Sequence, residues 1–364
     1  MRLRALVPPS VVLLLVGFAG PLVAEPYLAV QMGFKCAQCH VNPTGGGLRN
    51  PYGNAFAQTV LAARQLEMGE TEPWTGMFGK RLAMGANVRA NYQHVDVPGQ
   101  SSDGEFEVEE GRVFVDLAII PGRLSVYFDE RVAPGNADNS ETNVRFWMRE
   151  NSLYVKAGRL YLPFGWRLED DNAFVRQLSG IGMTTPDNGF ELGLESGPWT
   201  LQLAATNGSA GGPELDSGKQ VSLRTEHVRS MWRLGVSANR NDSDVGDRQV
   251  FGVHAGFRTG PLAWLGEVDY VDDDSFAPLG RKLLAGLGEV DWRLRAGHNL
   301  KFTFEYLDPD DDIDEDEQNR FSLVYELTPI QFLQLRLGAR VYDGIPQNDL
   351  QNRRQYFLQL HGFF

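Results

Sequence analysis

Apolar residues alternate with polar or small ones along most of the chain from Lys80 to the terminal Phe364. Segments such as RLAMGANVRANYQHV, LKFTFEYLD and FLQLRLGARV repeat with a period of two, which is typical of strands with one apolar and one polar face. The pattern predicts an all-β chain, a 16-stranded antiparallel transmembrane β-barrel over residues 79–364. We expect its strands to begin near residues 82, 104, 122, 142, 152, 190, 199, 218, 231, 248, 261, 281, 298, 319, 331 and 354.

The connections between these segments alternate in length. Tight connections such as IPGR, SGP and RTGP alternate with longer polar ones such as VPGQSSDG and DPDDDIDEDEQN. Bacterial outer-membrane barrels have this arrangement, with the short turns facing the periplasm. A soluble β-sandwich or barrel, which would bury its apolar face, is the alternative. A lipid-facing wall should carry two girdles of aromatic residues, and the apolar faces offer Trp199, Trp232, Trp264 and Trp292 beside tight turns and Tyr92, Tyr270 and Tyr306 beside long loops.

Residues 1–24 have the pattern of a secretory signal peptide, with a charged MRLR start, an apolar VVLLLVGFAG run and small residues before Glu25. An uncleaved membrane anchor is the alternative. No later stretch reaches the roughly 18 apolar residues that a spanning helix needs, so any membrane crossing is expected to use strands. Without Arg2 and Arg4 the chain has 32 basic and 47 acidic residues, a net charge of −15, which argues against nucleic acid as a partner.

The stretch FKCAQCHVNP contains both cysteines of the chain, in the spacing C-x-x-C-H. Covalent attachment of a c-type haem needs two thiols for the porphyrin vinyl groups and an imidazole directly after the second thiol as an iron ligand. The motif predicts haem c bound through Cys36 and Cys39, with His40 as axial ligand. A disulfide between the two cysteines is the alternative.

Residues 25–78 are expected to form a small monohaem cytochrome segment of loops and helix, too short to bury a haem alone. The run VNPTGGGLRNPYGN suits either a loop against the porphyrin or a flexible linker. Asn54 is predicted to cap a helix that continues to Met68. The barrel would have to cover the rest of the haem.

The alternating pattern also predicts which side chains face the barrel lumen. In the last strand Phe357, Gln359, His361 and Phe363 should point inward. The same parity places charges of both signs inside, namely Arg145, Arg149, Lys156, Arg224, Arg233, Glu267, Asp269, Glu289, Asp291, Arg293, Arg336 and Arg340. Candidates for the sixth ligand of the haem iron are Met32, Met68, Met77, His254 and His361.

Two loops stand out by length or charge. Residues 161–189 form the longest connection, which either folds into the pore with Arg167, Glu169, Asp170 and Asp171 or packs on the surface. The acidic run of residues 308–317 would attract calcium or ferrous iron, or is simply a solvated loop.

With CAQCH at residues 36–40 and a barrel closing at Phe364, the chain resembles the fused monohaem cytochrome–porins of bacterial outer membranes. The segment VKAGRLYLPFG, residues 155–165, is similar to phosphate-selective O/P porins. The resemblance implies electron exchange between an extracellular donor, ferrous iron in the iron oxidases of this family, and a periplasmic carrier such as a cytochrome c. The VNPTGGGLRNPYGN run departs from those oxidases, which leaves the identity of the donor open.

Three hypotheses follow for the function. The first is an electron conduit across the outer membrane, with or without oxidoreductase activity on an extracellular donor or acceptor. The second is a solute porin with a haem-bearing plug or redox gate. The third is a periplasmic cytochrome anchored by the barrel, with its haem segment at the periplasmic mouth or in the lumen.

Overall fold

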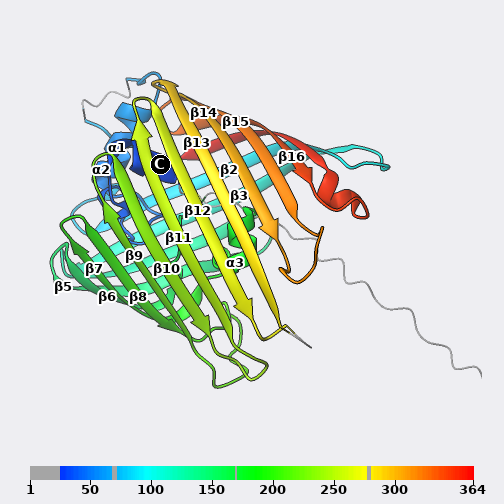
Figure 1. Ribbon diagram of the computed structural model, residues 1–364. Helices are drawn as coiled ribbons and strands as arrows, with labels where there is room; N and C mark the ends of the chain where they lie inside the picture. Colours follow the sequence, from blue (N-terminus) through cyan, green and yellow to red (C-terminus); the bar gives the residue numbers. More distant parts are fainter. Residues whose placement is uncertain (1–24, 68–71, 169, 277–279) are drawn as a thin grey trace, which may run out of the picture.

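A computed structural model describes residues 25–67, 72–168, 170–276 and 280–364, so the predicted signal peptide, Met68 and Glu169 lie outside the described residues. The chain forms one large antiparallel barrel with short helices at its N-terminus and in its longest loop (Figure 1). The helical elements are α1 (Pro26–Met32), the 3₁₀ turn η1 (Cys36–Gln38), α2 (Pro51–Phe56), the π-helical turn η2 (Ala57–Leu61), α3 (Phe174–Ser179) and the 3₁₀ turn η3 (Asp349–Asn352).

Sixteen long strands make the wall, and a two-residue strand, β1 (Met77–Phe78), pairs with the first of them. Each strand from β2 to β16 pairs with the next, and β17 returns to β2, which closes the barrel. The strands are β2 (Leu82–Asp96), β3 (Asp103–Ile120), β4 (Leu124–Ala133), β5 (Asp138–Arg149), β6 (Leu153–Leu160), β7 (Asp187–Ser196), β8 (Trp199–Thr206), β9 (Gln220–Val228), β10 (Trp232–Asn241), β11 (Arg248–Thr259), β12 (Leu262–Asp273), β13 (Arg281–Arg295), β14 (His298–Asp308), β15 (Gln318–Ile330), β16 (Leu333–Asp343) and β17 (Arg354–Phe363).

The strand predictions are confirmed. All sixteen begin close to the predicted positions, and the largest difference is at β5, expected near residue 142 and found from Asp138. The connections at one end of the barrel are tight, as between β7 and β8 at 197–198, whereas those at the other end are longer, as between β14 and β15 at 309–317. We call these the short-turn end and the long-loop end.

Side chains alternate between the two faces of the wall as the sequence predicts. In β17, Phe357, Gln359, His361 and Phe363 are buried in the lumen, while their neighbours Leu358 and Leu360 are about half exposed. The predicted luminal charges are buried or half-buried except Arg149, which is exposed because a bulge between Trp147 and Arg149 shifts the register at the end of β5.

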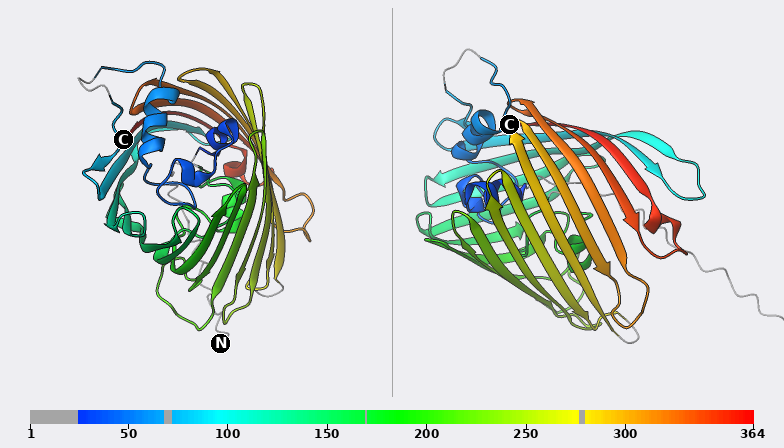
Figure 2. Two further views of the ribbon diagram at one scale, coloured as in Figure 1. Left: turned by 90° about the vertical axis from the view of Figure 1, so that its left-hand side faces the viewer. Right: turned by 45° about the horizontal axis from the view of Figure 1, so that its top comes forward.

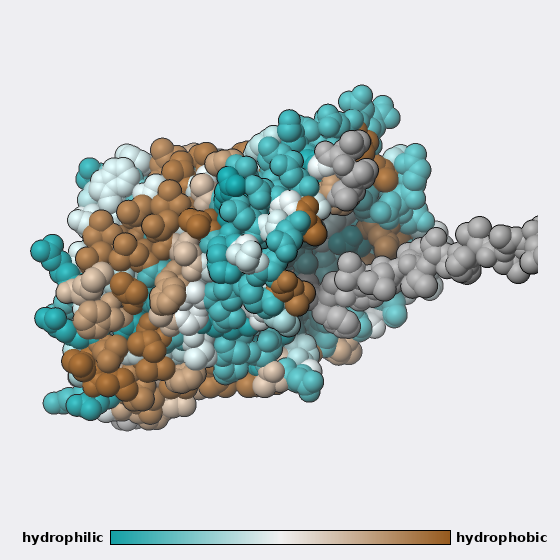
Figure 3. Space-filling model, turned by 90° about the horizontal axis from the view of Figure 1, so that it is seen from below, coloured by the Kyte–Doolittle hydropathy of each residue, from teal (hydrophilic) through white to brown (hydrophobic). Residues whose placement is uncertain are grey.

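The outer wall is apolar. Apolar side chains gather over much of it in the space-filling view, with hydrophilic side chains beside them (Figure 3). The predicted girdle residues lie on this face: Trp199, Trp232 and Trp292 are about half exposed, and Tyr92 and Tyr270 somewhat less. A face of this extent and apolarity requires a covering of lipid. Among the residues that the structure describes, no helix is both long and apolar enough to cross a membrane.

Val253 tests whether this face contacts lipid. It lies on β11, and 52% of it is exposed on the outer wall. Its partner Val268 lies about midway along β12, between the girdle residues Trp264 and Tyr270. We expect Val253→Arg to reduce the free energy of unfolding by about 2–4 kcal/mol, the cost of a charged side chain near the bilayer midplane. The measurement is guanidinium unfolding in lipid vesicles, with Val253→Ala as control. Equal effects of the two substitutions would contradict a lipid-facing wall.

The lumen is filled by two segments of the chain. The N-terminal segment, blue in Figure 2, lies inside the ring of strands near the short-turn end, and α3 lies within the barrel (Figures 1 and 2). Tyr27 and Val30 of α1 pack with Phe164, Trp166 and residues of α3 in one apolar cluster that includes side chains of β11, β12 and β13. The inward alternative for the longest loop is therefore confirmed.

The predicted helix from Asn54 to Met68 is wrong in its bounds. The helix begins at Pro51, and Asn50 caps it by accepting a hydrogen bond from Gly53 N at 2.9 Å. Pro51 takes the first helical position, where a proline is favoured because its missing N–H is not needed. The helix continues through the π-helical turn and ends at Leu61.

Candidate functional site

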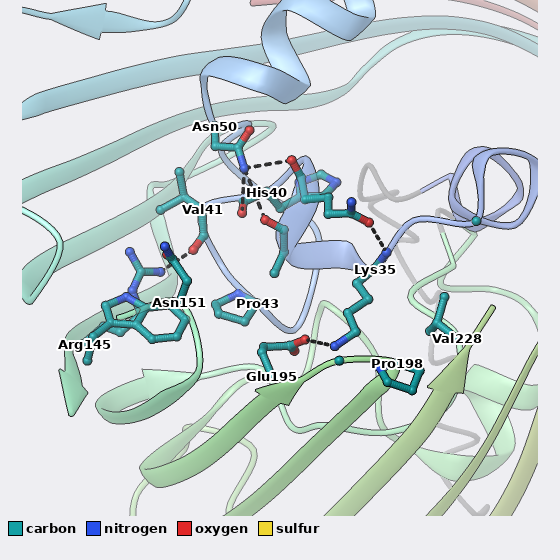
Figure 4. Close-up of a pocket in the computed structure, with 15 residues that line it drawn as sticks. Lys35, His40, Val41, Pro43, Asn50, Arg145, Asn151, Glu195, Pro198 and Val228 are labelled. Atoms are coloured by element: carbon teal, nitrogen blue, oxygen red, sulfur yellow. Dashed lines mark hydrogen bonds and ion pairs between the residues drawn. The ribbon is translucent and has the colours of Figure 1, made fainter. Parts of the chain in front are cut away.

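The C-x-x-C-H motif forms a compact turn inside the barrel. Cys36 begins the 3₁₀ turn, and its carbonyl accepts hydrogen bonds from the N–H groups of Cys39 and His40 at 3.1 and 3.0 Å. The Asn50 amide donates to the carbonyls of residues 37, 38 and 40 at 3.1–3.5 Å (Figure 4). An isolated antiparallel bridge joins His40 to Arg49. Residues 36–50 therefore form one closed loop that fixes the three motif side chains together.

The glycine run is part of this loop and is not a free linker. Gly45, Gly46 and Gly47 all have positive φ, a backbone conformation that residues other than glycine rarely adopt. A Cβ on Gly45 would lie 3.3 Å from Cys36 Sγ, so the backbone passes directly against that thiol. Leu48 is buried, and its N–H donates to the hydroxyl of Tyr127 at 3.1 Å, which ties the loop to β4.

Cys36, Cys39 and His40 all line one cavity in the lumen, together with wall and loop residues distant in sequence. The space not filled by atoms, including the part open to solvent, is about 1040 Å³. Much of the lining is apolar or glycine, the surface that a porphyrin needs. These apolar and glycine residues include Phe34, Gly45, Gly46, Phe56, Trp166 and Phe363.

The motif side chains are chemically free to take a ligand. Neither Cys36 nor Cys39 is in a disulfide. Burial raises the pKa of Cys39 to about 11, so it is a neutral thiol at pH 7. Burial, aided by the charge of Arg49, lowers the pKa of His40 to about 4. His40 is therefore a neutral imidazole at pH 7, the form that coordinates iron.

Four arginines also line the cavity: Arg49, Arg167, Arg224 and Arg233. Arg233 pairs with Glu226 at 2.6 Å and donates to the carbonyl of Phe34 at 3.1 Å, which links the N-terminal segment to β10. Guanidinium groups are suited to binding carboxylates, which a porphyrin carries as its propionates. The cavity thus offers two thiols, an imidazole, apolar faces and arginines, a donor set that fits a c-type haem.

The structure distinguishes between the five predicted candidates for the sixth ligand. Met68 lies outside the described residues, and Met32, Met77 and His254 are not among the described side chains that line the cavity. Met77 instead packs against the apolar cluster around Leu48. His361, from β17, does line it.

Two further hollows adjoin this cavity. At the short-turn end, a recess is lined by Lys35, His40 and the turn residues Glu195, Pro198 and Val228 (Figure 4). Lys35 and His40 line both recess and cavity. Toward the long-loop end, a charged vestibule shares Pro26 with the cavity and is lined by residues that include Asp170, Lys301, Arg320, Arg336, Arg340 and Arg353.

Trp166 and Arg49 were not predicted from the sequence to share a site with the motif, whereas Arg167 was among the loop residues that the inward alternative places over the cytochrome segment, and it lines the cavity. Trp166 and Arg167 lie in the loop after β6, and the indole nitrogen of Trp166 donates to the carbonyl of Gly266 on β12 at 3.0 Å. Their only signal in the sequence is that the longest loop carries them. Of the predicted loop residues, Asp170 and Asp171 line the vestibule.

Among known proteins, no family model and no curated sequence matches this chain. Solved structures do match its fold. A loop-deletion form of OmpT, an outer membrane protein of Vibrio cholerae, aligns with a TM-score of 0.62 at 10% identity, covering 78% of this chain and 99% of that one. An anion-selective porin from Comamonas acidovorans (TM-score 0.61, 11% identity, 78% and 99%) and OprB of Pseudomonas putida (0.61, 10%, 78% and 94%) are similar. The chain has the fold of outer-membrane porins.

Proposed function

We propose that this chain is a haem-carrying outer-membrane barrel that moves electrons between an extracellular donor or acceptor and a periplasmic carrier. The observation that carries the proposal is that Cys36, Cys39 and His40 line one cavity inside the barrel, between a hollow at each end. A c-type haem held there by the two thiols and His40 would supply a one-electron redox centre. Residues 25–78 then act as the cytochrome segment and residues 79–364 as its outer-membrane housing.

The residues around the cavity suit this role. Phe34, Phe56 and Trp166 give it a largely apolar lining, which limits water at the redox centre. Arg224 and Arg233 already pair with Glu226, so Arg49 and Arg167 are the arginines that would bind its carboxylates. The apolar cluster of α1 and the loop after β6 fills the lumen beside it. Transfer of electrons needs no open channel, so a filled lumen is compatible with this function.

The two hollows define where partners would meet the protein. Short turns face the periplasm in outer-membrane barrels, so the recess with Lys35 and Glu195 would receive a periplasmic carrier such as a cytochrome c. The vestibule opens toward the long loops and reaches the cavity at Pro26. An extracellular donor or acceptor would meet the protein there, and ferrous iron is the donor to test first.

The test uses the full chain with its haem attached, inserted in one orientation into liposomes. Ferrous iron, and then an impermeant reductant, is added on the long-loop side while the haem absorption bands are followed. We expect reduction from that side, and reduction by iron alone would identify the donor. Reduction only from the short-turn side would overturn the conduit and leave a periplasmic cytochrome anchored by the barrel.

A solute porin with a haem-bearing plug or redox gate is the second candidate. It is favoured by the porin fold and by the shared lining residues, because Lys35 and His40 line both the recess and the cavity, and Pro26 lines both the cavity and the vestibule. This candidate predicts ion conductance that changes with the redox state of the haem. Conductance that stays near zero in both states would exclude it.

A further inference from the structure

Among the described histidines of the chain, His361 alone combines three properties. It lines the cavity that holds Cys36, Cys39 and His40, it comes from the rigid wall strand β17, and 2% of it is exposed. The N-terminal segment docks directly beside it. Arg49, joined to His40 by the antiparallel bridge, lies over the ring of Phe363 at 4.7 Å, and that ring lies 5.0 Å from the ring of His361.

The hydrogen bonds of His361 leave one ring nitrogen unused. Its Nδ1 lies 3.3 Å from Gln334 Oε1, whereas its Nε2 is buried and has no hydrogen-bond partner. A buried polar atom without a partner costs free energy, so such an atom beside a cavity is available to a ligand that enters the cavity.

The environment of Gln334 determines which nitrogen of His361 has the lone pair. The amide nitrogen of Gln334 donates to Glu25 Oε1 at 3.2 Å, so its oxygen is the atom that faces His361. Nδ1 must therefore carry the proton of that hydrogen bond, and Nε2 has the lone pair. Histidines that bind metals commonly donate their second ring nitrogen in this way, which fixes both the tautomer and the ring orientation.

His254 provides the contrast. It is as deeply buried as His361, but its Nε2 lies 3.3 Å from both Arg224 and Glu226, and its ring packs on Trp166 at 5.1 Å. Its Nδ1 is also buried without a hydrogen-bond partner, but the side chain does not line the cavity, so that nitrogen does not face a haem there.

We propose that His361 supplies the second axial ligand of the haem iron through Nε2, with Gln334 and Glu25 as positioning residues. The barrel wall would then complete a site that the cytochrome segment begins with His40. This inference rests on the proposed function only in that a haem is attached at Cys36 and Cys39, and it holds for either direction of electron flow.

The test is electron paramagnetic resonance and visible absorption of the oxidised full-length protein in detergent. Two imidazole ligands give a low-spin ferric haem, and we expect His361→Ala to convert most of it to high spin. We expect His254→Ala to leave it low-spin. Adding imidazole to His361→Gly should restore the low-spin signal, and heat-dependent gel mobility confirms that each barrel is folded.

A His361→Ala protein that stays fully low-spin would overturn the proposal, as would a folded His361→Gly protein that shows no response to imidazole. If His361→Ala changes the spin state as expected but the wild-type haem is not reduced from the long-loop side, the conduit alone would be overturned. A wild-type protein without covalent haem would overturn both.

Discussion

A chain that carries Cys36→Ser and Cys39→Ser together is expected to form the same barrel and to retain no haem through denaturation. Thioether bonds to the two cysteines are the covalent link in c-type attachment, and the chain has no other cysteine. Serine is close to cysteine in size, and neither thiol belongs to an apolar cluster of the lumen, so the fold should tolerate the change. The measurement is haem staining after denaturing electrophoresis.

The single variants serve as controls for this experiment. Cys36→Ser and Cys39→Ser each keep one thiol in the cavity, so each should retain haem through one bond, with a lower yield than the wild type. Heat-dependent gel mobility reports whether the barrel has formed. Covalent haem in the folded double variant would contradict attachment at this motif, and reduction from the long-loop side should disappear together with the haem.

The wall could be predicted from the sequence because it follows a local rule. The alternation of apolar and polar side chains indicates both that a segment is a strand and which of its residues face inward. The inward positions of Gln359 and His361 were therefore predicted correctly without any knowledge of their neighbours. Where the backbone departs from that rule, the prediction fails. The bulge at Trp147 and Arg149 inserts a residue that no periodicity reveals, and Arg149 is exposed as a result.

The helix after the motif shows a second limit. Asn50 and Asn54 are both good capping residues, and only Pro51 marks the earlier one as the start. The cavity shows a third limit, because its members come from opposite ends of the chain. Cys36 and His361 line the same cavity because the N-terminal segment lies inside the barrel that the pairing of β17 with β2 closes, and Trp166 joins them from the loop after β6. Contacts of this kind have no short-range signal.

The largest effect outside the haem motif is expected at Arg320, which holds the loop after β6 against the far wall. Arg320, 2% exposed on β15, pairs with Asp170 of the loop at 2.8 Å and with Glu305 of β14. Glu305 in turn accepts a hydrogen bond from the N–H of Phe174, at the start of α3, at 2.9 Å. One guanidinium therefore connects two strands with both the loop and its helix.

Removing one partner of a buried ion pair leaves the other charge without compensation, which costs roughly 3–5 kcal/mol. In Arg320→Ala, Glu305 loses its ion-pair partner, and Asp170 keeps only Arg340, at 2.9 Å. The loop has further ties to the wall, among them the ion pairs of Arg176 with Glu267 and Asp269 and the apolar cluster around Phe164 and Trp166. We therefore expect the loop to loosen around Asp170 and the start of α3, while the rest of the loop stays packed and the barrel, whose strand pairing is untouched, remains closed.

The readouts for Arg320→Ala are proteolysis of the loop and conductance in a planar bilayer. The vestibule that Asp170, Arg320 and Arg340 line should widen, so conductance should rise above that of the wild type although the N-terminal segment still fills part of the lumen. Arg240→Ala is the matched control, because Arg240 pairs with Asp242 and Asp247 at the exposed surface, where such pairs contribute little to stability. If Arg320→Ala conducts no more than Arg240→Ala and its loop is no more sensitive to protease, Arg320 does not hold the loop in place. If the wild type already shows the conductance of an open porin, the lumen is open in the native protein, and the solute-porin candidate would replace the electron conduit.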